Sequence, residues 1–585
     1  MGIKYFFGWM KKTFASHIKT LTIHTNLREI VEVDTFLIDM NGIFHYCCQK
    51  IYQYGNFRHL AEKEEKNERN DKNEKNEKKE KKKTSSSYLQ RKLFEMVGAY
   101  LDKLITFVKP RKRVVMAIDG PAPFSKQAQQ RSRRYRSARD NEDGVFDSNA
   151  ITPGTLFLDH LSKYIDWHIR RRLGEGVWGD IEVIFSPEKS PGEGEHKLVK
   201  FVREHGTENE SYMMQGMDAD LVMLSLATHK TNFHILRENP YRYEYEYYYI
   251  NLKEIRENLV NALLCDQSLL PDSVHINDFI AMIFLTGNDF LPHLPTIEIL
   301  EGGVDHLFET YRMVVKQHGP LTTTVNTLNF PAFFAFLGQL SLQENEALCT
   351  KRAKPINFPD TLLEKYTKLN REATYDIAFP EYRKAYYAEK MGCHTQKDID
   401  MACMKYIDGI QWVLTYYTQG VSNWKWFYPY DHAPFLSDLV KSVEKYYAYR
   451  DHNDNHNFYL KKTDPYPPFL QLLCVLPPKS RTLLPSPLSD MMMMPQLESS
   501  YPCEFTVDLD GKINEWEGVV KLPPLQYEHI EKEYYKRLRT IDEKEKRRNF
   551  LGKSFIYTPI RDPYFYKSYY GDLTECKTNS AIFTL

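Results

Sequence analysis

Four short apolar runs of this chain each lead into a turn that carries carboxylates, and this repeat constrains the fold more than any other feature. Short β-branched and apolar runs bounded by Gly, Pro or Ser are typical of buried strands. In open α/β sheets, ligands bind at the carboxyl ends of the strands. The runs and their acidic residues are 33–38 with Asp39, 114–118 with Asp119, 181–185 with Glu193 and Glu195, and 212–214 with Asp218 and Asp220. The pattern predicts one sheet with an acidic edge.

A further carboxylate, Asp289, follows the apolar segment 279–285. Carboxylates gathered in one place repel one another and raise each other's pKa values. Hard divalent cations relieve that repulsion, and Mg²⁺ or Mn²⁺ favours oxygen ligands. Two such ions roughly 3.5–4 Å apart recur in enzymes that hydrolyse phosphodiesters. Any one of these residues alone is more simply a cap or turn residue, so the metal-site hypothesis depends on the full set: Asp39, Asp119, Glu193, Glu195, Asp218, Asp220 and Asp289.

A basic segment, residues 126–136, follows Asp119 and consists of good helix formers. Its long polar side chains fall at i, i+4, i+7 and i+8, which is one face of a helix. These side chains are Lys126, Gln130, Arg133 and Arg134. Guanidinium groups can hold phosphate in a bidentate manner, so the face could bind phosphate. A solvated basic face is the simpler alternative, and proximity to Asp119 favours phosphate binding.

Three blocks of the sequence resemble the signature motifs of the XRN family of 5′→3′ exoribonucleases. They are residues 192–197 (GEGEHK), 217–224 (MDADLVML) and 287–295 (GNDFLPHLP). More distantly, the arrangement is similar to flap endonucleases and PIN-type nucleases. The resemblance runs from Met1-Gly2 to about Tyr557. It implies an α/β fold with a PIN/flap-nuclease-like central sheet flanked by helices and a largely helical second region packed against it.

The resemblance divides the chain into a nuclease domain, residues 1–300, and a second conserved region, residues 301–585, that completes the active-site pocket. Residues 62–87 are rich in Lys, Glu and Asn and have almost no apolar side chains. Such a segment cannot offset its ordering entropy, so we expect a disordered surface insertion. A partner-binding role for it is the alternative. Because the chain stops soon after the resemblance ends, we also expect it to lack the barrel-like C-terminal domains of the large cytoplasmic members.

The resemblance also implies roles for single residues. The basic face named above is expected to grip a 5′-monophosphate, although Phe124 stands where the family usually has a basic residue. Asn41 is placed with the substrate-binding residues, and His45, one turn further on, is expected to stack on a nucleobase or, equally, to be a packed or capping histidine. A tryptophan from residues 412–434 is expected to cap the site, with Trp426 favoured over Trp424.

We therefore expect a processive 5′→3′ exoribonuclease that hydrolyses single-stranded, 5′-monophosphorylated RNA to mononucleotides with two Mg²⁺ or Mn²⁺ ions. The expected setting is RNA or mRNA decay, with decapping or other RNA-decay factors as partners. A structure-specific 5′ flap DNA nuclease and a catalytically silent RNA-binding scaffold are the alternatives.

Lys+Arg and Asp+Glu number 78 each, so attraction to nucleic acid must be local. The nine cysteines form no Cys-x-x-Cys pair, and the chain carries no secretory signal or membrane-length apolar run. We expect a cytoplasmic protein that does not span a membrane, with a nuclear location as the alternative. The oligomeric state stays open.

Overall fold

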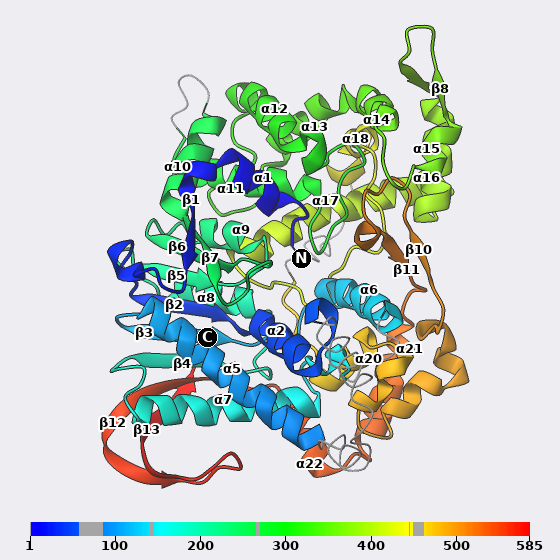
Figure 1. Cartoon of the computed structure of the whole chain (residues 1–585). Helices are drawn as coiled ribbons and strands as arrows, with labels where there is room; N and C mark the ends of the chain where they lie inside the picture. The colour runs from blue at the N-terminus through cyan, green and yellow to red at the C-terminus, as the bar shows by residue number, and fades with distance from the viewer. Residues whose placement is uncertain (1, 58–85, 141–145, 265–269, 444, 448–460) are drawn as a thin grey trace, which may run out of the picture.

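The computed structural model describes residues 2–57, 86–140, 146–264, 270–443, 445–447 and 461–585. The expected insertion, residues 62–87, lies outside these residues except for its last two positions, which begin helix α5 (Ser86–Val108). The described chain is a mixed α/β structure in which helices flank a large central sheet (Figure 1). The fold class predicted from the sequence is confirmed.

Nine strands form the central sheet, in the order β1-β7-β6-β5-β2-β3-β4-β12-β13. The five strands from β6 to β4 are parallel, and the strands beyond them at each edge are antiparallel. The strands are β1 (Ile18–Thr22), β2 (Thr35–Asp39), β3 (Arg113–Ala117), β4 (Glu182–Ser186), β5 (Tyr212–Gln215), β6 (Phe233–Glu238), β7 (Glu246–Asn251), β12 (Ser554–Tyr566) and β13 (Leu573–Phe583).

Alternate side chains of the central strands enter two separate hydrophobic cores, one on each face of the sheet. In β2, Leu37 belongs to one core, whereas Phe36 and Ile38 belong to the other. Helices α2 (Met40–Tyr52), α5 and α7 (Leu156–Gly174) cover one face. Helices α8 (Gly194–His205), α9 (Leu221–Leu226), α10 (Leu252–Leu263) and α11 (Asp272–Ile283) cover the other. Because both faces are buried, these strands have the mostly apolar sequences from which they were predicted.

The rest of the chain is mostly helical. Two helices outside the sheet layers are α1 (Phe6–Thr13) and α6 (Phe124–Asp140). The second region contains α12 (Gly303–His318), α13 (Phe330–Ser341), α14 (Glu344–Ala353), α15 (Thr361–Lys365), α16 (Phe379–Met391), α17 (Gln396–Thr418), α18 (Leu436–Lys441), α20 (Pro468–Val475), α21 (Tyr527–Leu538) and α22 (Glu543–Lys546), with the hairpins β8 (Thr367–Leu369)–β9 (Tyr375–Ile377) and β10 (Thr506–Asp508)–β11 (Val519–Lys521). Among the described helices, none combines the length and the apolar character needed to cross a bilayer.

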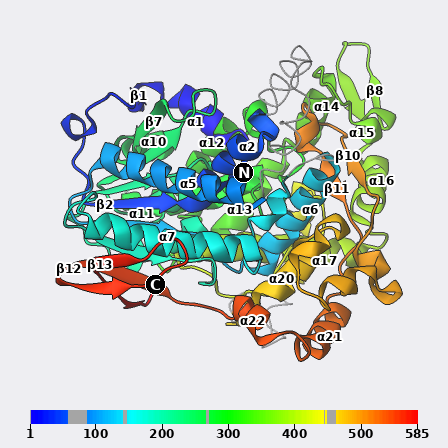
Figure 2. The ribbon, with the colours of Figure 1, turned by 60° about the horizontal axis from the view of Figure 1, so that its bottom comes forward.

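The C-terminal hairpin β12–β13 joins the sheet built by the first half of the chain. β12 pairs with β4 through Phe555 opposite Phe185, and the hairpin lies beside α7 (Figure 2). Arg170 of α7 donates hydrogen bonds to Tyr564 Oη and Ser580 Oγ at 3.0 and 2.7 Å. The predicted division near residue 300 remains a prediction, and residues far beyond it complete the first sheet.

Candidate active site

The carboxyl ends of four neighbouring parallel strands carry the predicted carboxylates. Asp39 is the last residue of β2, and Asp119 follows β3 by two residues. Glu193 is the N-cap of α8, whose first turn contains Glu195, and this helix follows β4. The loop between β5 and α9 supplies the remaining pair, Asp218 and Asp220. Parallel strands end at the same edge, so tertiary structure brings the separate acidic turns to one place.

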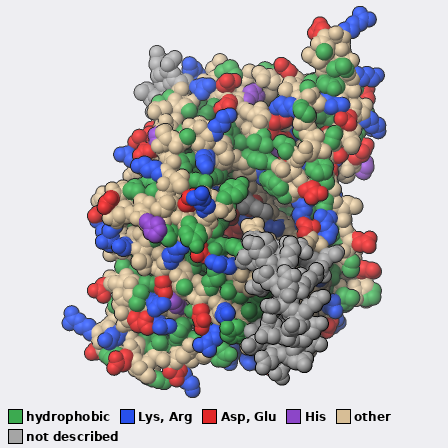
Figure 3. Space-filling model, viewed as in Figure 1, with side chains coloured by type: hydrophobic (Ala, Val, Ile, Leu, Met, Phe, Trp, Pro, Cys, Tyr) green, Lys and Arg blue, Asp and Glu red, His purple; other side chains and the backbone are tan. Residues whose placement is uncertain are grey.

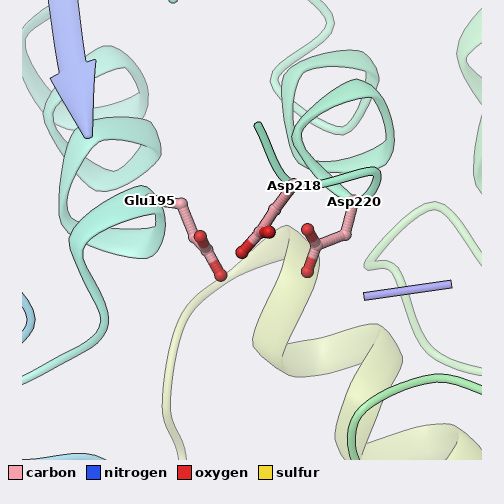
Figure 4. A group of neighbouring side chains, drawn as sticks. All are labelled: Glu195, Asp218 and Asp220. Atoms are coloured by element: carbon pink, nitrogen blue, oxygen red, sulfur yellow. The ribbon is translucent and has the colours of Figure 1, made fainter. Parts of the chain in front are cut away.

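The tightest group within this edge is Glu195, Asp218 and Asp220. One carboxylate oxygen from each lies within 4.8 Å of the others, and the three side chains point toward one another (Figure 4). Glu195 and Asp220 are only 5% and 2% exposed. Asp220 Oδ1 is buried and has no hydrogen-bond partner among the described residues. An all-oxygen donor set with an unsatisfied buried oxygen fits a hard divalent cation.

Asp39 and Asp119 are held beside this group by hydrogen bonds. Asn41 Nδ2 donates to Asp119 Oδ2 at 2.7 Å, and the backbone N–H of Gly194 donates to Asp119 Oδ1 at 2.7 Å. A Cβ at Gly194 would lie 2.9 Å from Asp39 Oδ1. The glycine between the two glutamates is therefore required for the close approach of α8 to the end of β2. Asn41 was expected among the substrate-binding residues, and in the structure its side-chain amide donates a hydrogen bond to the Asp119 carboxylate.

Lys126 connects the remaining two carboxylates. Its Nζ lies 2.5 Å from Glu193 Oε2 and 2.7 Å from Asp289 Oδ2. Asp289 comes from the loop after α11, so the ion pairs bring it to the acidic edge. Lys126 was predicted to bind phosphate, and the structure places its charge between two carboxylates. It therefore neutralises part of the acidic edge from within.

Burial and repulsion between neighbouring charges raise the pKa values of three carboxylates of the acidic edge: Asp39, Glu195 and Asp220. Burial, followed by the charges of Asp218 and Asp289, raises the pKa of Asp220 to about 7. Burial and the charge of Asp220 raise the pKa of Glu195, and burial and the charge of Asp119 raise the pKa of Asp39. Groups this costly to ionise together are stabilised when a divalent cation binds them. The acidic edge is thus suited to divalent metal ions.

Two consecutive tyrosines of α17 reach the same edge from the second region. Tyr416 Oη donates to Glu193 Oε1 at 2.7 Å, and Tyr417 Oη donates to Asp220 Oδ2 at 3.3 Å. The Tyr416 ring stacks on His196 of α8 with its centroid 3.7 Å away. The sequence analysis missed both tyrosines as site residues, because no local pattern tells which carboxylate a buried hydroxyl will meet.

A cavity of about 380 Å³, here called the phosphate pocket, lies against the acidic edge. The predicted basic face of α6 lines it, together with five of the seven carboxylates: Asp39, Asp119, Glu193, Glu195 and Asp218. Neither Arg133 nor Arg134 has an ion-pair partner among the described residues. Gln130 Oε1 and Arg134 Nε are buried without hydrogen-bond partners there. The unsatisfied N–H of Arg134 and the unneutralised guanidinium groups of Arg133 and Arg134 make this pocket receptive to an anion.

Phe124 occupies the first position of α6 and does not line the phosphate pocket. It is 8% exposed and packs edge-on against Phe427 and Tyr527 in a separate hydrophobic core. An apolar residue at this position therefore anchors the start of α6. The charge of the pocket comes from residues further along the same helix.

His45 lines the phosphate pocket, and its stacking on a nucleobase remains a prediction. Burial, aided by the charges of Arg133 and Arg134, lowers its pKa to about 4, so the ring is neutral at physiological pH. A neutral, flat ring beside a phosphate site can stack on a base.

Trp426 does not have the position that was predicted for it. It is 2% exposed, and its ring stacks on Trp412 with the centroids 4.8 Å apart. Gly409 packs close to Cζ2 and Cη2 of the same ring. Trp426 therefore cannot stack on a base, and the prediction is wrong for this structure. Trp424 is half-buried in the core around Phe124. Trp516 is 55% exposed, more than any other tryptophan of the chain.

Comparison with known proteins assigns the chain to a family. Residues 1–239 match the family model of the XRN 5'-3' exonuclease N-terminus, and residues 272–378 and 370–582 match that of the Xrn1 helical domain. The chain belongs to the XRN family. Both signature regions of XRN proteins are thus present, and the acidic edge and the phosphate pocket lie mostly within the first.

Relatives with curated names cover most of the chain. It is 29% identical to human 5'-3' exoribonuclease 1 over 97% of its own length and 36% of the relative's. It is 27% identical to the Drosophila melanogaster 5'-3' exoribonuclease 2 homolog, over 97% of its length and 74% of the relative's. Identity to 5'-3' exoribonuclease 1 of Saccharomyces cerevisiae is 26%, over 95% of the chain and 44% of the relative. The chain therefore spans between about a third and three quarters of these relatives.

Proposed function

We propose that this XRN protein is a metal-dependent 5′→3′ exoribonuclease that removes nucleotides one at a time from single-stranded RNA with a 5′-monophosphate. One observation carries the proposal: the acidic edge and the unpaired guanidinium groups of Arg133 and Arg134 border the same cavity. The XRN family models and the names of the relatives support the same activity.

The two ends of the phosphate pocket suit two successive phosphates. Gln130, Arg133 and Arg134 would hold the 5′-phosphate, because guanidinium donors match phosphate oxygens in a bidentate manner. The next phosphate would then lie at the acidic edge, so each cut would release one mononucleotide. A cap or triphosphate would add groups beyond the 5′-phosphate, and we expect the pocket to exclude them. His45 would stack on the terminal base.

Glu195, Asp218 and Asp220 would hold divalent ions, Mg²⁺ or Mn²⁺, which supply a Lewis acid for the phosphate and an activated water. The protein's own groups provide the geometry. Lys126 compensates Glu193 and Asp289, Asn41 orients Asp119, and the tyrosines of α17 fix two carboxylates. Preorganised groups of this kind lower the barrier by positioning and by stabilising charge.

The test compares 5′-monophosphorylated and 5′-triphosphorylated RNA in a time course with Mg²⁺, with Mn²⁺ and with EDTA. We expect mononucleotide release only from the monophosphorylated RNA and only with metal. Asp218→Ala should abolish degradation while RNA binding stays measurable. Asp562→Ala, on the exposed part of β12, is the matched control and should degrade RNA at the wild-type rate. Full activity in Asp218→Ala would remove the assignment of the acidic edge.

A structure-specific 5′ flap DNA nuclease is the rival enzyme, because it needs the same arrangement of carboxylates. Branched DNA added to the same time course separates the two, since preferential cleavage of the branch would favour the rival. A catalytically silent RNA-binding scaffold is less well supported, because all seven predicted carboxylates are present and gathered. We further propose a role in RNA decay in the cytoplasm, which depends on the exoribonuclease activity.

A further inference from the structure

Lys197, the last residue of the GEGEHK block, is a buried lysine of α8 that has no role so far. Lysine side chains normally lie in solvent, and the Lys and Arg side chains visible in Figure 3 are spread over the surface. Lys197 is only 3% exposed. Among the described residues, no carboxylate oxygen lies within 4.0 Å of its Nζ, whereas the buried Lys126 pairs with two carboxylates. Burial of a lysine without such a partner is costly unless hydrogen bonds satisfy its donors.

Three backbone carbonyls surround Lys197 Nζ. It donates hydrogen bonds to the oxygens of Ser186, Pro187 and Ser190, at 3.4, 3.1 and 3.1 Å. These carbonyls belong to the end of β4 and to the turn that leads from β4 into α8. A lysine side chain has three donors and no acceptor, so the three carbonyls match its full hydrogen-bonding capacity. Lys197 therefore holds the turn against the start of the helix.

The oxygen of Ser190 lies where this turn meets the turn after β3. A Cβ at Gly120 would lie 1.8 Å from the oxygen, so only glycine fits there. Backbone hydrogen bonds join the same two turns in both directions: Gly120 N–H donates to Gly192 O at 2.9 Å, and Gly192 N–H donates to Pro121 O at 2.8 Å. Among the described residues, Lys197 is the one donor that the structure shows for Ser190 O. These contacts between the two turns are here called the turn clasp.

A carboxylate of the acidic edge adjoins each half of the turn clasp. Asp119 immediately precedes Gly120, and Glu193 immediately follows Gly192. Gly192 has a φ of +107°, and a Cβ there would lie 3.4 Å from Lys197 Cγ. The stem of the lysine therefore packs against the residue before Glu193, while its Nζ holds the carbonyl that lies against the residue after Asp119. The placement of these two carboxylates thus depends on contacts that Lys197 makes.

We propose that Lys197 is a positioning residue of the acidic edge, which through the turn clasp sets Asp119 and Glu193 in the arrangement that divalent metal ions require. The inference deepens the proposed function and rests on it for the role of these carboxylates. Lys197 does not line the phosphate pocket, so it acts through the carboxylates and not on the RNA. Residues that orient metal ligands in this way contribute about 10–100-fold to metal affinity or activity.

The test replaces Lys197 with Met in the full chain, because Met has a similar shape and no donor. The matched control is Lys200→Met on the same helix, where the lysine side chain is 42% exposed and pairs only with Glu204. Binding of Mn²⁺ to the folded proteins, without RNA, is measured by electron paramagnetic resonance. We expect at least about tenfold weaker Mn²⁺ binding in Lys197→Met. The control should bind Mn²⁺ as tightly as wild type.

Affinity for 5′-monophosphorylated RNA in EDTA is the second readout. It should stay at the wild-type value in Lys197→Met, because Arg133 and Arg134 line the phosphate pocket from α6. Gly120→Ala disturbs the turn clasp from its other side and should also weaken Mn²⁺ binding, so it tests the inference even if Lys197→Met does not fold. In the double variant the two losses should be less than additive, because both act through one set of contacts.

Wild-type Mn²⁺ affinity in folded Lys197→Met, or in Gly120→Ala, would overturn the inference. It would do so even if urea denaturation showed lower stability, because Lys197 would then only stabilise the fold. An equal loss of Mn²⁺ binding and of RNA binding in EDTA would also overturn it, since the damage would then extend beyond the acidic edge. Failure of the proposed function gives a different result, because wild type itself would then not degrade 5′-monophosphorylated RNA, whatever the Mn²⁺ affinity of the variants.

Discussion

Replacing Asp220 with Asn should stabilise the metal-free protein while it removes activity. The Asp220 carboxylate is 2% exposed, and burial together with Asp218 and Asp289 raises its pKa from 3.8 to about 7. A shift of about 3 pKa units corresponds to about 4 kcal/mol of lost stability when the group is ionised. Asn has the same shape and can still accept the hydrogen bond from Tyr417. The neutral side chain therefore avoids this loss.

The sign follows from which state holds the proton. Between about pH 4 and pH 7 the unfolded protein has ionised Asp220 while the folded protein keeps it protonated, so the free energy of unfolding falls as pH rises. Above about pH 7 both states are ionised and the loss is complete. Relative to wild type, Asp220→Asn should gain about 4 kcal/mol at pH 8 in EDTA, and this gap should shrink as pH approaches 4.

Urea denaturation in EDTA at pH 5 and pH 8 measures the gap, with exposed Asp562→Asn as the control that should show none. Added Mn²⁺ should stabilise wild type more than the variant, because a ligand that binds only the folded state stabilises it by mass action. The reasoning is refuted if Asp220→Asn is no more stable than wild type at pH 8 without metal. Burial and the charges of Asp218 and Asp289 would then not raise the pKa of Asp220.

Three further variants test other parts of the site. Gly194→Ala places a Cβ 2.9 Å from Asp39 Oδ1, so we expect at least tenfold lower kcat and about 1–3 kcal/mol lower stability, checked by kinetics and denaturation. Tyr416→Phe removes the hydroxyl that donates to Glu193 at 2.7 Å, so it should raise the metal concentration needed for half-maximal activity. The control Tyr387→Phe removes a donor to Asp438 and should leave that metal concentration unchanged. Arg134→Met should lower kcat/KM for 5′-monophosphorylated RNA by about 10–100-fold and leave 5′-hydroxyl RNA unaffected, since a charged hydrogen bond contributes about 1.5–3 kcal/mol.

The sequence alone determined four central strands of the sheet and the acidic edge at their carboxyl ends. The runs that became β2, β3, β4 and β5 are mostly apolar because both faces of the sheet are covered, and such runs can be read from neighbouring residues. Their carboxylates then had to meet, because parallel strands end at one edge. The cationic face of α6 could also be predicted from neighbouring residues, since helix periodicity alone places its side chains on one side.

Only the tertiary structure decided which groups meet across long distances in the chain. It placed Lys126 between two carboxylates, brought Tyr416 to Glu193, and paired β12 with β4. It also buried Trp426 against Trp412. The sequence of a Trp-rich segment does not tell which of its tryptophans is buried and which is exposed. Periodicity reports which face of an element is buried. Packing of distant elements decides what lies opposite that face, and no stretch of neighbouring residues encodes it.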